Sequence, residues 1–211
     1  MWGKSLWIFF LGVQLHFTID HHYLLQDALA TGRTSTKAHL FGDEIWKWQR
    51  CLRKLEYYTN TGSRVLALVY RFRFHRLSIK LGYEIPLNVC EEGLSLPHRG
   101  PIVVGHRAGI GKFCRIHEGV TIGATNGSDK CAVIGNNVFI ASGAKIIGDI
   151  SIASDVAIGA NAVVTKSISE SGTTWGGIPA KKISDNDSHS NLRFAYKEDP
   201  SGKTEANDEC H

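Results

Sequence analysis

The sequence predicts an α+β protein in which a helical segment precedes a β-solenoid. The residue after most members of a six-residue apolar repeat is glycine or alanine. Six residues match neither a helix nor plain strand alternation, and they fit a short strand plus a tight corner. A short fixed period indicates stacked units that form a shared core. The repeat comprises Ile110, Ile116, Ile122, Ile134, Ile140, Ile146, Ile152, Ile158 and Val164.

The chain divides into four expected parts. We expect an N-terminal extension over residues 1–19, a helical domain over 20–83, a β-helix over 84–183 and a polar, disordered tail over 184–211. The tail is expected to be disordered because it is rich in Ser, Asp and Asn. The repeat is interrupted at residues 124–132, whose polar turn formers predict an excursion from the coil.

Three helices are expected in the helical domain. The first covers residues 22–30, and the third covers about 64–81 and is ended by Gly82. The second follows Asp43, a residue type suited to an N-cap. Its apolar residues recur at helical spacing: Ile45, Trp48, Leu52 and Leu55.

The charge is mild overall but uneven. The formal net charge is +4, yet residues 46–83 contain nine Lys or Arg and one acid, Glu56. Such a segment can attract nucleic acid, anionic lipid or a phosphorylated substrate. We expect a solvated helix face and no nucleic-acid partner, with membrane-surface association as the weaker alternative.

Five cysteines without a CxxC pair indicate a reduced, cytoplasmic protein with no disulfide framework. The apolar stretch at residues 6–13 is too short to span a bilayer and lacks a cleavage pattern. We therefore expect an extension or docking helix there rather than an export signal.

Three phrases resemble the hexapeptide-repeat acyltransferases, and their serine acetyltransferase branch above all. They are LPHRGPIVVG at residues 96–105, IHEGVTIG at 116–123, and the long repeat at 134–168 followed by GGIPAK at 176–181. The resemblance implies a left-handed parallel β-helix, acetyl-CoA as co-substrate and a homotrimer. It identifies His98, in LPHRG, as a general base that removes the proton of an acceptor hydroxyl. Glu84 stands where the branch has an aspartate partner for this histidine.

The resemblance also suggests cofactor-binding positions, namely Ser142, Ala160, Gly177 and Lys181. The first two are small residues that let pantetheine approach, and the last two lie in the closing GxPAK phrase. No metal is expected. The three-histidine zinc pattern of γ-type carbonic anhydrases does not match the spacing of His98, His106 and His117. The last two are therefore expected at an edge or interface.

Two departures from the branch concern the acceptor. Cys131 replaces a second histidine, and Arg33 is followed by Thr34, Ser35 and Thr36 instead of the carboxylate that grips the serine amine. These departures favour a sugar acceptor, as in homologues that O-acetylate capsule or exopolysaccharide. Serine O-acetylation in cysteine biosynthesis is the alternative, and a non-catalytic β-solenoid scaffold is the rival of another class.

Overall fold

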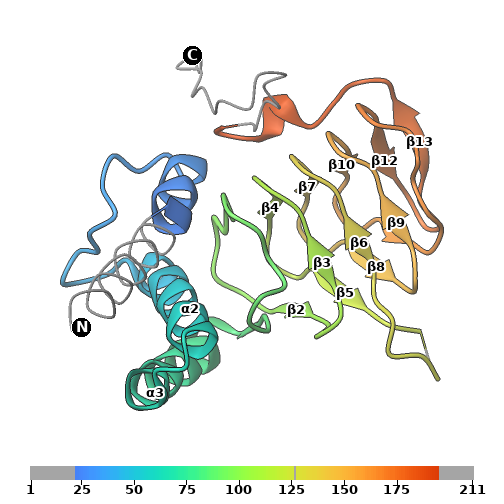
Figure 1. Ribbon diagram of the computed structural model, residues 1–211. Coiled ribbons are helices and arrows are strands. Elements are labelled where there is room, and N and C mark those ends of the chain that lie inside the picture. Colours follow the sequence, from blue (N-terminus) through green and yellow to red (C-terminus); the bar gives the residue numbers. More distant parts are fainter. Residues whose placement is uncertain (1–21, 126, 195–211) are drawn as a thin grey trace, which may run out of the picture.

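The computed structural model describes residues 22–125 and 127–194 and places a helical region beside a solenoid (Figure 1). Residues 22–30 are helical, as predicted. Helices α2 (Glu44–Asn60) and α3 (Arg64–Leu81) follow, and α3 ends at Gly82 in the left-handed conformation. Trp48, Leu52 and Leu55 of α2 are buried, which confirms the predicted apolar stripe. No helix among the described residues is long and apolar enough to cross a membrane.

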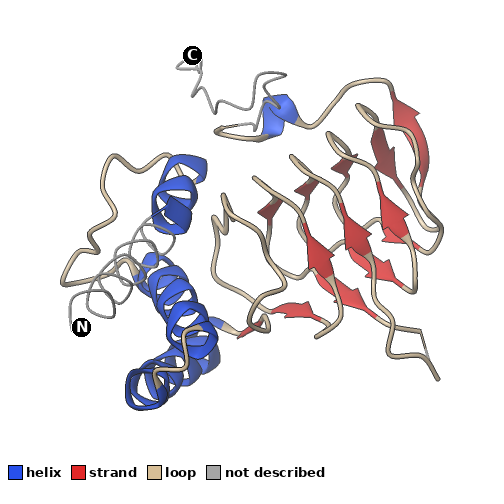
Figure 2. Cartoon of the chain, in the orientation of Figure 1, coloured by secondary structure: helices blue, strands red, loops and turns tan. Residues whose placement is uncertain are grey.

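The solenoid has three faces, each a sheet of parallel strands, and the chain passes through the three faces in turn (Figure 2). One sheet has the order β1-β2-β5-β8-β11, the second β13-β12-β10-β7-β4, and the third β3-β6-β9, and only β13 pairs antiparallel. The left-handed sense of the coil stays a prediction. The bounds are β1 Tyr83–Glu84, β2 Ile102–Val104, β3 Gly109–Ile110, β4 Arg115–Ile116, β5 Thr121–Gly123, β6 Val133–Ile134, β7 Phe139–Ile140, β8 Lys145–Ile147, β9 Ser151–Ile152, β10 Ala157–Ile158, β11 Val163–Val164, β12 Thr174–Gly176 and β13 Lys181–Ser184.

The six-residue repeat forms the core because parallel register stacks equivalent residues. Ile116, Ile140 and Ile158 pair across β4, β7 and β10 and are each fully buried. Burial of each of these isoleucine side chains contributes about 1.5–3 kcal/mol to the stability of the fold, relative to leaving the side chain exposed. The segment between β5 and β6 leaves the coil, as predicted, with exposed residues at 127–130.

The corners of the coil use left-handed backbone. Phe113, Asn137 and Asp155 stand at one corner of successive coils with φ of 53°, 53° and 62°. Asn and Asp tolerate this conformation, whereas a bulky Phe rarely adopts it. The buried Phe113 ring contacts Phe194, with ring centroids 5.0 Å apart.

The tail differs from its prediction over residues 186–194. Ser188 is fully buried and its hydroxyl donates to the Asn137 carbonyl, while His189 pairs with Asp155 at 2.8 Å. A short 3₁₀-helix, η1 (His189–Asn191), lies within this segment. These residues are ordered because their polar groups bond the corner backbone of the coils. Residues 195–211 and the expected extension at 1–19 lie outside the described chain.

A buried ion cluster joins the helices to the solenoid. Arg53 of α2 donates to Asp27 at 2.8 and 3.2 Å, to Glu56 at 3.0 Å and to the Cys90 and Glu91 carbonyls. Asp27 also accepts from the Leu94 backbone at 2.9 Å. Burial raises the pKa of the Asp27 carboxyl, and the Arg53 guanidinium opposes that rise.

Asp43 precedes α2 as predicted but does not cap it with its side chain. Its carboxylate instead binds the Arg33 guanidinium at 2.8 and 2.6 Å and accepts from the His39 backbone at 3.1 Å. A charged, bidentate partner is a stronger competitor than a backbone N–H.

Candidate active site

One corner of the solenoid aligns polar residues from successive coils. The last residues of β4, β7 and β10 are in register, so Glu118, Ser142 and Ala160, each two residues further on, stack in one column. Backbone bonds at 2.9 Å, from Gly143 to Glu118 and from Asn161 to Ser142, fix this stacking. Two of the three residues in this column, Ser142 and Ala160, have small side chains.

His98 belongs to the same corner, one coil earlier. A parallel bridge pairs Ser95 with Arg115, three residues before His98 and Glu118, and brings the two segments to the same corner. The Tyr83 hydroxyl donates to the His98 carbonyl at 2.5 Å and fixes the backbone there. Burial raises the pKa of Tyr83 to about 12, so this phenol remains a donor at neutral pH. The His98 side chain itself is exposed.

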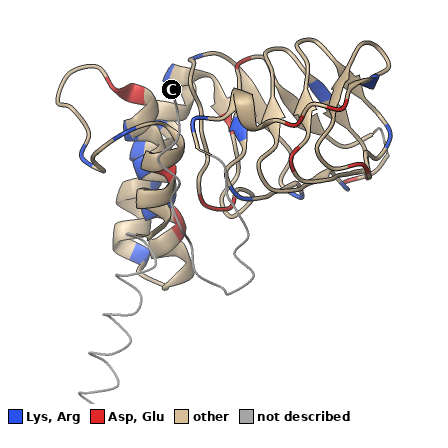
Figure 3. Cartoon of the chain, turned by 90° about the horizontal axis from the view of Figure 1, so that it is seen from above, with Lys and Arg blue, Asp and Glu red and all other residues tan. Residues whose placement is uncertain are grey.

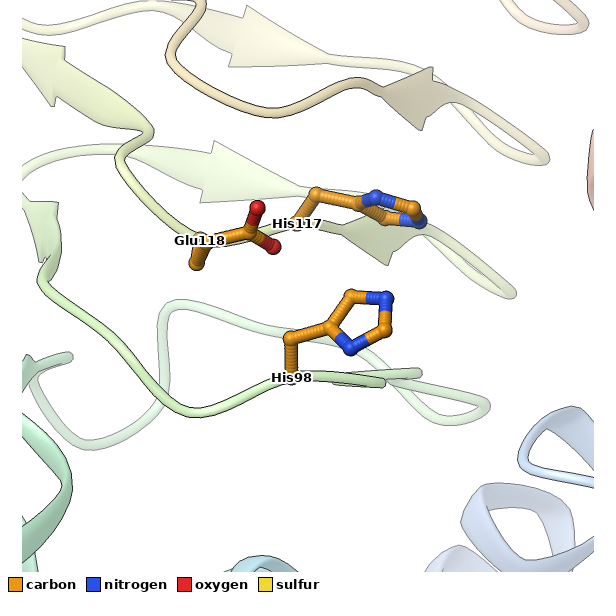
Figure 4. Close-up of side chains that lie close together, drawn as sticks. All are labelled: His98, His117 and Glu118. Atoms are coloured by element: carbon orange, nitrogen blue, oxygen red, sulfur yellow. The ribbon is translucent and has the colours of Figure 1, made fainter.

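His98, His117 and Glu118 form a cluster (Figure 4). Ligand atoms of the three side chains all lie within 4.8 Å of one another. The two imidazoles meet edge to face, with centroids 5.2 Å apart, and His117 also contacts the Phe139 ring at 5.1 Å. The Glu118 carboxylate points toward both rings. One exposed imidazole therefore lies beside a second ring and a carboxylate.

His117 is held in its neutral form. Burial lowers the pKa of His117, the neighbouring Arg115 and His98 lower it further, and the Glu118 carboxylate opposes this fall. The Arg115 Nε lies 3.4 Å from His117 Nε2, and the Ser142 Oγ lies 3.5 Å from His117 Nδ1. Because Arg115 can only donate, these long contacts favour the tautomer with the proton on Nδ1.

Glu118 is held as a carboxylate. A hydrogen bond from Ser142 is the largest cause of its lowered pKa, with backbone bonding and the two histidines adding to the effect. Its Oε2 is buried and has no hydrogen-bond partner in the described part of the chain. A buried acceptor of this kind is costly unless something donates to it. A substrate hydroxyl, an ammonium or the His98 N–H has the required chemistry.

The cluster has the side-chain types of a His₂Glu metal site. Its geometry is compatible with that reading, since the ligand atoms lie within 4.8 Å. Arg115, however, directs a positive charge at His117 Nε2, which opposes a cation at that nitrogen. The same charge does not oppose proton transfer at the exposed His98.

Among the described residues, the predicted partner Glu84 forms no hydrogen bond or ion pair with this cluster. It is the exposed residue of β1, whereas its neighbour Tyr83 points inward. Among residues 22–125 and 127–194, no hydrogen bond or ion pair joins Glu84 to His98. The Glu84–His98 dyad therefore stays a prediction, and Glu118 is the carboxylate that the fold brings to the imidazole.

The predicted cofactor positions fall at two places. Ser142 and Ala160 occupy the corner column, in line with Glu118. Gly177 and Lys181 flank the turn between β12 and β13, and the Gly177 carbonyl accepts from Val163 at 3.0 Å. Lys181 is exposed. Their role toward acetyl-CoA stays a prediction.

Cys131 lies outside the cluster's contacts. It is buried, and a Cβ added to Gly105 would stand 2.4 Å from its Sγ, so a larger residue at position 105 would force this sulfur to move. The Gly105 amide donates to the Ile122 carbonyl at 2.8 Å and so is not free to stabilise an oxyanion. Asp129, earlier in the excursion, pairs with Arg107 at 2.7 Å.

Sequence reasoning missed His117 and Glu118 as site residues. His117 was expected at an edge, and Glu118 was not singled out. A usable signal existed: both follow the repeat residue Ile116 directly, where the repeat otherwise has small residues such as Ala141 and Ser142. The distance to His98 required the register of the irregular first coils.

The comparisons with known proteins agree with this architecture. The bacterial transferase hexapeptide (six repeats) family matches residues 131–166. A serine acetyltransferase of Staphylococcus epidermidis is 36% identical over 145 residues, covering 67% of this chain and 60% of the relative. One of Synechococcus elongatus is 34% identical over 121 residues, covering 56% and 49%. The chain thus spans between 49% and 60% of the length of these two curated relatives.

A solved structure extends the likeness into the helical region. The crystal structure of Neisseria gonorrhoeae serine acetyltransferase in complex with serine aligns with a TM-score of 0.60 and 25% identity, over 81% of this chain and 72% of that one. The six-residue repeat, the three-sided solenoid and these likenesses lead to one conclusion. The chain resembles the hexapeptide-repeat acyltransferases, and among them the serine acetyltransferases.

Proposed function

We propose that this protein is an acetyl-CoA-dependent O-acetyltransferase in which His98 is the general base. The observation that carries the proposal is the exposed His98 imidazole, held within 4.8 Å of His117 and the Glu118 carboxylate. A histidine with an adjacent carboxylate is suited to proton transfer near neutral pH. The names of the relatives support acetyl transfer as the reaction.

In the proposed reaction, His98 takes the proton of the acceptor hydroxyl as its oxygen attacks the thioester carbonyl. Glu118 stabilises the imidazolium that forms, and neutral His117 packs against it without adding a second charge. When the tetrahedral intermediate collapses, the C–S bond breaks and His98 returns the proton to the thiolate. The acetyl group ends on the acceptor oxygen, so atoms and charge balance.

Serine is the acceptor that the comparisons favour. The relatives reported above are serine acetyltransferases, and the gonococcal structure was solved with serine. The expectation of a saccharide gains no support from them. In this proposal the unpartnered Glu118 Oε2 is a candidate acceptor for the serine ammonium.

A sugar remains the second candidate because of Cys131. This buried thiol stands where the branch has its second histidine. Two carboxylates near Arg33 and Arg99 are already engaged, since Asp43 pairs with Arg33 and Glu44 pairs with Arg99, each at 2.6 Å. These ion pairs compete with any binding of a serine ammonium there. A homotrimer and a cytoplasmic location accompany the proposal as expectations from the resemblance.

The test is thiol release from acetyl-CoA by the full chain, with serine and with a panel of sugars. We expect His98→Ala to lower kcat by about 10²- to 10⁴-fold. His106→Ala, an exposed histidine of the next corner, is the matched control and should retain activity. Glu118→Gln and Glu84→Gln compare the two candidate partners, and the larger loss identifies the one that acts.

Each outcome has a meaning. Turnover with serine alone removes the sugar candidate, and turnover with a sugar alone removes serine. If no acceptor is turned over and CoA does not bind, the scaffold hypothesis replaces the enzyme.

A further inference from the structure

A basic cavity lies in the helical region, away from the residues of the candidate active site. Its volume is about 500 Å³, and α2, α3 and the segment before α2 line it. Its lining contains five cationic side chains and no carboxylate: Lys47, Arg50, Lys54, Arg73 and Arg76. Lys and Arg recur along both helices in Figure 3.

The cations of this cavity lack compensating acids. Arg50 Nε is buried and has no hydrogen-bond partner in the part of the chain that is described. No ion pair among the described residues involves Arg50 or Arg73. Lys54 donates to the Tyr70 hydroxyl at 3.4 Å and lies 5.5 Å from the centroid of the Tyr70 ring.

The buried Cys51 thiol lines the same cavity as these cations. Burial raises the pKa of Cys51, and Arg73, Arg50 and Lys54 each oppose that rise. Lys47 holds the rim in place, because its Nζ donates to the Leu40 and Gly42 carbonyls at 2.7 Å. Like charges that line one cavity repel one another, and a bound anion would offset that repulsion.

The structure assigns this cavity as a binding site for a phosphate group, an inference that goes beyond the proposed acetyl transfer. Guanidinium and ammonium groups around one cavity match the several acceptor oxygens of a phosphate. The phosphate could come from a free phosphorylated molecule or from a lipid headgroup. Exposed apolar residues beside the cavity, Leu40 (82%), Phe41 (87%) and Phe72 (63%), make a headgroup chemically suitable.

The experiment uses the full chain at low salt with two probes. Inorganic pyrophosphate is titrated by calorimetry, and co-sedimentation is measured with phosphatidylcholine vesicles with and without phosphatidylglycerol. The variant R50Q/K54Q/R73Q removes three cavity charges. The control K37Q/R64Q/R71Q removes three charges from exposed residues that do not line this cavity.

We expect at least one probe to bind wild type and the control alike, and the cavity variant to bind about tenfold more weakly. Pyrophosphate binding alone identifies a free ligand, and binding to phosphatidylglycerol vesicles alone identifies a headgroup. The proposal is overturned if neither probe binds or if the control weakens binding as much as the cavity variant. Should the triple variant not fold, Arg73→Gln, at an exposed position, makes the same comparison. Neither result depends on acetyl transfer.

Discussion

The solenoid and the helical region are held together in different ways. In the solenoid, the same kind of contact recurs in every coil, with buried isoleucines paired in register across β4, β7 and β10. In the helical region, α3 buries only Leu81, and the link to the first coil combines the Arg53 cluster with the apolar contacts of Trp48 and Leu52 of α2. Stability is distributed in one region and concentrated in the other. A single change should therefore have different consequences in each.

The largest expected effect is at the concentrated link. Arg53→Met leaves Asp27 and Glu56 buried without their cation, and we expect a loss of about 3–5 kcal/mol in the free energy of unfolding. Urea unfolding followed by circular dichroism measures it. Arg71→Met, on exposed α3, is the control. A double variant that also carries Asp27→Asn should lose less than the two single losses added together. A loss below about 1 kcal/mol for Arg53→Met would show that the cluster is not the anchor.

Within the solenoid, a substitution of a buried residue should cost more stability than one of an exposed residue. The same unfolding assay can compare the two. Ile140→Ala removes a fully buried side chain, and we expect a cost of about 2–5 kcal/mol. Val133→Ala, 59% exposed on a neighbouring face, should change stability by no more than about 0.5 kcal/mol. Equal effects of the two substitutions would contradict the inward and outward assignment of the repeat.

A close approach between coils gives a sharper test of packing. Gly105→Ala places a methyl group against the Cys131 sulfur, and we expect a cost of about 1–3 kcal/mol. Cys131→Ala in the same chain removes that sulfur and should recover most of the loss. Additive losses in the double variant would rule out the contact as the cause.

The smallest expected effect concerns pH at the candidate active site. The folded pKa of His117 is lowered from its usual 6.5, chiefly by burial. As pH falls below 6.5, the unfolded chain therefore binds more protons than the folded chain. The stabilising contribution of neutral His117 declines in this range. His117→Gln should flatten the fall in melting temperature on acidification relative to wild type. The same slope in both proteins would show that His117 titrates normally.

The same contrast explains what could be predicted from the sequence. The solenoid, the excursion and the three helices follow from periodic or local signals, and His98 belongs to a motif that resembles a catalytic one. The Arg53 cluster joins residues far apart in the chain, and no spacing reveals such a contact. Glu118 escaped for a related reason, because its place beside His98 depends on the register of irregular coils. The order of residues 186–194 depends on bonds to corner carbonyls, which composition does not encode.

The segment around Ser188 changes how the stack can come apart. In a linear array each coil touches only its neighbours, so either end can unravel by itself. Here the chain returns past the corners of several coils, from Asp155 through Asn137 to Phe113. Fraying of the last coil thus pulls on contacts made near the first. The returning segment contacts several coils at once, so these coils must unfold together.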